Sequence, residues 1–122
     1  MHVHLRDPGL CYKETLETGA KAAAKGGFTT ICPMPNTVPV MDTPEKVTEF
    51  LKRAETESCV HILPVGSVTV NQEGEILADI AGMAKAGAVG ISEDGKSVMN
   101  TAVYREAMKE AAKAQILVMA HC

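Results

Sequence analysis

Apolar and polar positions along this chain follow two different periods in turn. Some segments repeat apolar residues every three or four positions, which is typical of amphipathic helices. Between them lie shorter, nearly continuous apolar runs rich in β-branched residues, which indicate strands covered on both faces. Helices are predicted over residues 14–27, 44–56, 76–87 and 101–114, and strands over residues 28–32, 59–68, 88–92 and 116–121.

Residues at the segment ends support this division. Thr43 followed by Pro44 predicts an N-cap and a first helical position, and Gly87 is placed to close the third helix. The spacing of apolar residues predicts an inward face on each helix. The inward face predicted for the third helix includes Ile76, Leu77, Ile80 and Met83, and that for the fourth includes Val103, Ala107, Met108 and Ala111.

The order of elements predicts an α/β fold with a parallel sheet. If residues 2–5 (HVHL) form a first strand, about five strands alternate with four helices, and such units have right-handed crossovers. Two architectures fit, a doubly wound open sheet and a partial (β/α)8 barrel. The length of 122 residues favours the open sheet, because a complete barrel needs about 250 residues. The placement of polar residues favours the barrel.

Composition and charge narrow the function. The chain is 46% hydrophobic and 22% charged, which is typical of a single globular domain over residues 1–122. A net charge of −3 argues against a nucleic-acid partner. No apolar run approaches the length of a membrane span, and the first residues do not resemble a signal peptide. We therefore expect a cytoplasmic protein without a membrane partner.

Polar residues follow the predicted strands at the points where they end. In parallel α/β folds the carboxyl ends of the strands meet on one rim, where ligand sites form. Four of the five strand ends carry such groups. They are His2 and His4, Asn36, the acidic pair Glu93 and Asp94, and His121.

The paired histidines indicate a metal site. His2 and His4 are two positions apart, so a strand places both imidazoles on one face. His121 and a carboxylate at 93 or 94 would complete a nitrogen and oxygen ligand set that zinc accepts. Two histidines near a chain end are also typical of an exposed surface, but their joint placement with the other rim residues favours the metal site.

The roles of other residues near the strand ends are predicted less specifically. The guanidinium of Arg6 can grip a carboxylate with two hydrogen bonds, although it could also be a surface cation. Asn36 could bind a substrate through its amide or cap a turn. Residues 7–9 (DPG) read as structural, with Asp7 accepting local backbone hydrogen bonds before a turn. His61, in the first half of its strand, is predicted to be packed.

Three motifs together resemble a known family. The stretches HVHLRDPG at 2–9, PMPNT at 33–37 and SEDG at 92–95 are similar to those of class I dihydroorotases in the amidohydrolase superfamily. The resemblance covers the whole chain. It implies part of a (β/α)8 TIM barrel with one or two zinc ions. The implied reaction is the reversible cyclisation of N-carbamoyl-L-aspartate to L-dihydroorotate in de novo pyrimidine biosynthesis.

The resemblance also assigns residues and partners. It implies that His2, His4, Asp94 rather than Glu93, and His121 bind zinc, and that Arg6 and Asn36 hold the substrate carboxylate. The partners it implies are this small substrate, a second copy in a homodimer, and aspartate transcarbamoylase. A further histidine ligand and the general base of the family would lie beyond residue 122. We therefore expect a barrel domain truncated at both ends and inactive in isolation.

Three alternatives stay open on the sequence. A non-catalytic dihydroorotase-like subunit that scaffolds aspartate transcarbamoylase would usually lack zinc ligands, whereas all four expected in this segment are present. Allantoinases and hydantoinases generally place a lysine after strand four, where this chain has SEDG. The third alternative is a self-contained open-sheet binding domain, in which the joint placement of the polar residues at the strand ends would be a coincidence.

Overall fold

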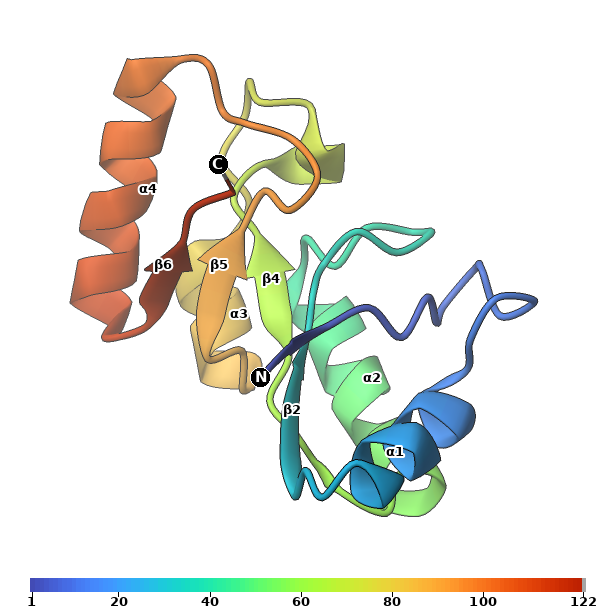
Figure 1. The fold of residues 1–122 in the computed structure, drawn as a ribbon. Helices are drawn as coiled ribbons and strands as arrows, with labels where there is room; N and C mark the ends of the chain where they lie inside the picture. Colours follow the sequence, from blue (N-terminus) through green and yellow to red (C-terminus); the bar gives the residue numbers. More distant parts are fainter. Residues whose placement is uncertain (122) are drawn as a thin grey trace.

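All the strands in the structure run parallel. The structure is a computed structural model that describes residues 1–121 (Figure 1). Hydrogen bonds join the strands in the orders β1-β2-β3 and β4-β5-β6. The strands are β1 (His2–Val3), β2 (Thr30–Pro33), β3 (His61–Ile62), β4 (Val65–Ser67), β5 (Gly90–Ser92) and β6 (Leu117–Met119).

Strands β3 and β4 are two halves of one extended run. β3 pairs with β2 and β4 pairs with β5, with Leu63 and Pro64 between them. The Leu63 amide donates to Ile31 at 3.0 Å, and the Pro64 carbonyl accepts from Val89 at 3.0 Å. This run therefore connects the two sheets, and the five predicted strands are present with the third one divided.

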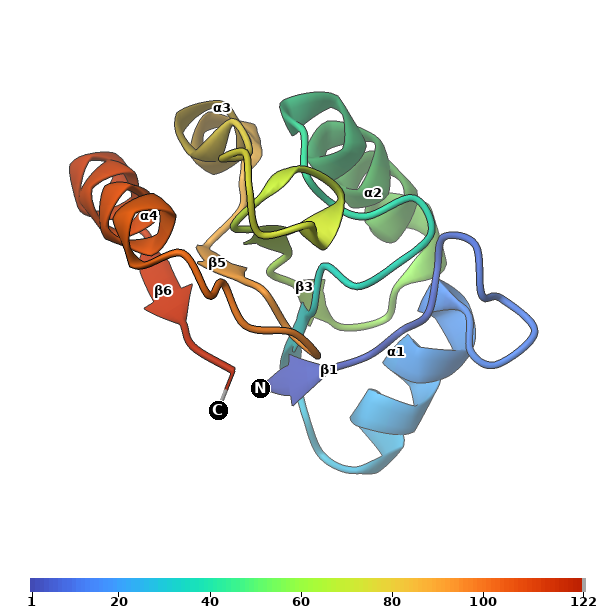
Figure 2. The ribbon, with the colours of Figure 1, turned by 90° about the horizontal axis from the view of Figure 1, so that it is seen from above.

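The α-helices all lie on one side of the strands (Figure 2). A doubly wound sheet would carry helices on both faces and reverse its strand order. The sequential order and the single helical layer are those of a barrel segment, so the fold is a partial (β/α)8 barrel and the open-sheet alternative is wrong. The helices are α1 (Leu16–Lys25), α2 (Pro44–Glu57), α3 (Ile80–Ala86), α4 (Thr101–Ala114) and a 3₁₀ helix, η1 (Val70–Gln72).

The helix ends agree with the sequence signals in α2 and differ in α3. Thr43 caps α2 by accepting from the Lys46 amide, and Pro44 is its first residue, as predicted. Helix α3 begins at Ile80 rather than near residue 76, because Asp79 caps it by accepting from the Gly82 amide. Ile76 therefore precedes the helix and is 68% exposed, so its predicted inward position is wrong.

The core lies between the strands and the helical layer. It joins Ile31 and Ile91 from the sheet to Val47 and Phe50 of α2. The inward face of α4 is narrower than predicted, because Met108 is about half exposed. Within residues 1–121, no helix has both the length and the apolar content that crossing a bilayer requires.

Candidate metal centre

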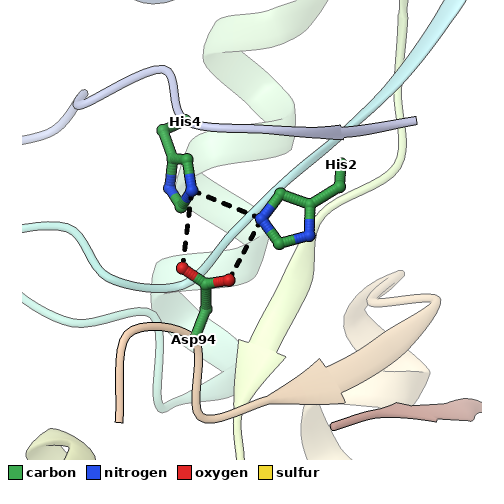
Figure 3. Close-up of side chains that lie close together, drawn as sticks. All are labelled: His2, His4 and Asp94. Carbon is green, nitrogen blue, oxygen red and sulfur yellow. Dashed lines mark hydrogen bonds and ion pairs between the residues drawn. The ribbon is translucent and has the colours of Figure 1, made fainter. Parts of the chain in front are cut away.

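Side chains from two distant parts of the chain meet at the carboxyl ends of β1 and β5 (Figure 3). His2 lies on β1, His4 follows it by one residue, and Asp94 lies two residues after β5. The two histidine Nε2 atoms are 3.3 Å apart. Asp94 Oδ1 lies 3.0 Å from His2 Nε2, and Asp94 Oδ2 lies 3.4 Å from His4 Nε2.

This arrangement fits a zinc ion. Zinc bonds of about 2.0–2.1 Å in tetrahedral geometry place neighbouring ligand atoms about 3.3 Å apart. The two imidazole nitrogens are separated by that distance, and a different carboxylate oxygen of Asp94 lies close to each of them. The donor set of two imidazole nitrogens and one carboxylate is typical of zinc. The Asp94 side chain is buried while His2 is about half exposed. The cluster therefore has a buried acidic side and a solvent-accessible side.

The two histidines stand on a well-anchored strand. His2 pairs in register with Cys32 of β2. The Cys32 amide donates to Met1 at 2.7 Å, and the Met34 amide donates to Val3 at 3.0 Å. Because these bonds fix the backbone around β1, the strand period turns both imidazoles to the same face.

The neighbouring carboxylate, Glu93, faces a different part of the fold. Its Oε2 accepts hydrogen bonds from the amides of Val68 at 3.0 Å and Thr69 at 3.2 Å. Its Oε1 accepts from the Thr69 hydroxyl. The side chain is buried, so these bonds tie the end of β5 to the loop after β4. Of the two adjacent acids, Asp94 is therefore the one that meets the histidines.

A residue that the sequence did not single out supports the same corner. The buried Gln72 donates from its side-chain amide to the Asp94 carbonyl at 3.3 Å. Gln72 and Asn71 both have positive φ, at 55° and 52°, which non-glycine residues seldom adopt. The Gln72 carbonyl in turn accepts from Lys96 Nζ at 2.9 Å. The only sequence signal was an N-Q-E-G stretch typical of a turn.

Asn36 lies between two members of the cluster. It follows β2 by three residues and is partly buried. Its Oδ1 lies 3.0 Å from His4 Nδ1, and its Nδ2 donates to Asp94 Oδ2 at 3.0 Å. The structure thus brings a residue predicted to hold substrate into direct contact with two predicted metal ligands.

His121 and Arg6 lie at the margin of the cluster. His121 Nδ1 is 3.7 Å from Asp94 Oδ1, and its side chain is 44% exposed. The compact group of possible ligands comprises His2, His4 and Asp94 without it. Arg6 is on the loop after β1 with φ 61°, and within residues 1–121 its guanidinium forms no hydrogen bond or ion pair with another side chain.

Asp7 anchors the loop that follows the histidines. It is 3% exposed and accepts two bonds from Arg53 of α2, at 2.7 and 2.9 Å. It also accepts from the Leu16 amide at the start of α1, at 3.0 Å. The predicted structural role is present, but its partners are distant in sequence rather than local. The Arg53 hydrogen bonds, offset in part by burial, hold the pKa of Asp7 below its ordinary value.

The lowered pKa of Asp7 predicts a specific acid sensitivity. Its stabilising contribution is present above the ordinary pKa of 3.8 and is lost as pH falls through the lower folded value. We expect the free energy of unfolding to fall steeply below about pH 4. Urea titrations between about pH 6 and about pH 2 check this, with Asp7→Asn expected to flatten the acid limb. An identical pH profile in that variant would contradict the prediction.

His61 is not packed as predicted. Its side chain is exposed at β3, and it lines an open cavity with Phe28, Cys59 and Leu51 at the amino ends of the strands. That end is opposite to the rim that carries His2, His4 and Asp94. His61 is therefore remote from the candidate centre.

Comparison with known proteins agrees with the three motifs. A family model described as dihydro-orotase-like matches residues 1–122. A dihydroorotase from Brevibacillus brevis is 48% identical over 121 residues, which are 99% of this chain and 28% of that protein. A dihydroorotase from Syntrophus aciditrophicus is 49% identical over 123 residues, covering 100% of this chain and 29% of that protein.

A solved structure is similar in fold. It is an L-hydantoinase (dihydropyrimidinase) from Arthrobacter aurescens, with a TM-score of 0.81 and 28% identity. The likeness covers 98% of this chain and 28% of that one. The chain thus spans little more than a quarter of the length of the proteins it matches.

Proposed function

Because the chain belongs to the dihydro-orotase-like family, we propose that it supplies one side of the active site of a zinc-dependent dihydroorotase. The proposed reaction interconverts N-carbamoyl-L-aspartate and L-dihydroorotate, closing or hydrolysing a cyclic amide. The observation that carries the proposal is the convergence of His2, His4 and Asp94 at distances that suit one zinc ion. The identity of about 48% to dihydroorotases over the whole chain supports this substrate class.

In this proposal His2, His4 and Asp94 hold the metal, and His121 joins them from the end of β6. One or two ions are compatible with these residues. A zinc ion here supplies a Lewis acid for the amide carbonyl and makes water a better nucleophile at neutral pH. The buried carboxylate of Asp94 contributes a negative charge, and this charge favours the binding of a divalent cation between the three side chains.

Arg6 and Asn36 are the proposed contacts of the substrate carboxylate. Both dihydroorotate and carbamoyl aspartate carry such a group. The Arg6 guanidinium, which has no side-chain partner among residues 1–121, can donate two hydrogen bonds to it. Asn36 uses one N–H on Asp94 and keeps its second N–H for a substrate oxygen. The small substrate would thus be held between the loops that follow β1 and β2.

Two rival functions make different demands on the same residues. The likeness to the L-hydantoinase structure is compatible with a hydantoinase or an allantoinase. It does not favour these classes over a dihydroorotase, since Asp94 stands where a lysine is expected in them. A non-catalytic scaffold for aspartate transcarbamoylase would have no need of the metal cluster. A homodimer is compatible with either the enzyme or the scaffold.

Zinc content tests the proposal directly. We expect the purified protein to retain zinc after dialysis and a His2→Ala, His4→Ala double variant to lose it, because two of three converging donors are gone. His61→Ala is a matched control, since this exposed histidine lies at the opposite end of the strands. Elemental analysis measures the outcome, and equal zinc in all three proteins would refute the metal site.

Turnover distinguishes the functions once zinc is established. We expect hydrolysis of dihydroorotate, and not of hydantoin, by the protein that carries this sequence together with the family's general base. Preference for hydantoin would favour the rival hydrolase. Zinc binding with no turnover of either substrate would count against both hydrolases.

A further inference from the structure

The amide of Asn36 has an orientation that chemistry dictates. An ionised carboxylate can only accept hydrogen bonds, so the Asn36 nitrogen must face Asp94 Oδ2 at 3.0 Å. The Asn36 oxygen then faces His4 Nδ1, also at 3.0 Å, and an amide oxygen can only accept. His4 must therefore donate, which places a proton on its Nδ1.

This proton determines what the other ring nitrogen offers. A neutral imidazole with Nδ1–H has a lone pair on Nε2. His4 Nε2 is the atom that lies 3.3 Å from His2 Nε2 and 3.4 Å from Asp94 Oδ2. A lone pair directed at a carboxylate oxygen is repelled by it, and a metal ion held between the two atoms would relieve that repulsion. The Nδ1–H tautomer is the one in which Nε2 can bind a metal.

The backbone around Asn36 keeps the amide in place. The Met34 amide bonds to Val3, so the end of β2 is fixed against the strand that carries the histidines. The Pro35 carbonyl accepts from the amides of Thr37 at 2.8 Å and Met41 at 3.1 Å. Asn36 therefore stands on a turn that is bonded on both sides, which lets its short side chain act as a rigid bridge.

We propose that Asn36 is a positioning residue of the metal centre, which fixes the tautomer of His4 and braces the Asp94 carboxylate. The inference rests on the proposed function, because it concerns the same metal site. It adds a role to the substrate contact proposed above, and the two are separable since metal binding can be measured without substrate. Asn36 touches the ligands through one N–H and its oxygen, so the second N–H stays available.

The first test is zinc affinity in the absence of substrate. Asn36→Leu has similar size and removes both hydrogen bonds, and we expect zinc to bind about 10- to 100-fold more weakly. Competition with a chromophoric chelator measures the dissociation constant in the full chain. Asn100→Leu is the control: the Asn100 side chain bonds to the amides of Ala102 and Val103 and to none of the three ligands, so this change removes a helix cap and should leave zinc affinity unaltered. Asn36→Ala repeats the test if the leucine variant does not fold.

The second test reads the tautomer itself. Long-range ¹H–¹⁵N spectra of the zinc-free protein in mildly alkaline buffer distinguish Nδ1–H from Nε2–H histidines. We expect Nδ1–H for His4 in the wild type and a mixture in the Asn36 variants. An Nε2–H tautomer in the wild type, or zinc affinity that Asn36→Leu and Asn36→Ala leave unchanged, would overturn the positioning role alone. A wild type without zinc affinity would overturn the proposed function as well.

Discussion

Replacing Asp7 with alanine is expected to lower the free energy of unfolding by about 2–4 kcal/mol. The carboxylate is buried and receives two bonds from Arg53 and one from the Leu16 amide. Its removal leaves the buried Leu16 amide without its acceptor and leaves Glu57 as the carboxylate that remains beside the Arg53 guanidinium. The cost stays below that of a fully buried ion pair, because the Arg53 side chain is about one-third exposed. Urea unfolding of both proteins measures the difference.

The effect should extend to the metal centre. Asp7 ties the loop after His4 to α1 and α2, so its loss frees the chain that leaves β1. Glu57→Ala is a suitable control, because it removes the other carboxylate of Arg53 at a more exposed position. We expect a much smaller loss of stability from that change. Equal losses of unfolding free energy in the two variants would show that burial of Asp7 does not increase its contribution to stability.

The sequence predicted the element order and the shared rim, for clear physical reasons. Strand and helix periods depend on neighbours within a few positions, so α2 begins where the cap Thr43 indicates, and α4 covers the predicted residues 101–114. The two-residue spacing of His2 and His4 predicts one face on any strand. These features need no knowledge of the tertiary fold.

Features that depend on tertiary pairing could not be predicted in this way. The choice between open sheet and barrel depends on which side of the sheet each helix covers, and both have the same local pattern. The bond from Asn36 to Asp94 joins residues 58 positions apart, and those from Glu93 reach back 24 and 25 positions. Helix α3 was misplaced because the turn before Asp79 is apolar at Ile76 and Leu77, which continues a helical spacing without forming a helix.

Glu93→Ala is expected to cost about 2–4 kcal/mol of unfolding free energy and to weaken zinc binding. The change leaves the buried amides of Val68 and Thr69 without an acceptor and opens a void beside the Thr69 hydroxyl. Because Glu93 directly precedes Asp94, a shift of this corner also moves the carboxylate that faces the histidines. Chemical denaturation and chelator competition on the same variant measure both effects.

Glu93→Gln separates packing from charge at this position. Glutamine has the same length, its carbonyl can accept from both amides, and its amide can donate to the Thr69 oxygen. We expect it to retain most of the stability and the zinc affinity that alanine loses. If glutamine were as damaging as alanine, the negative charge of Glu93 would itself be required, and Glu93 would then act on the metal centre through its field. If zinc affinity survived both changes, Asp94 would be positioned by Gln72 and Asn36 without help from its neighbour.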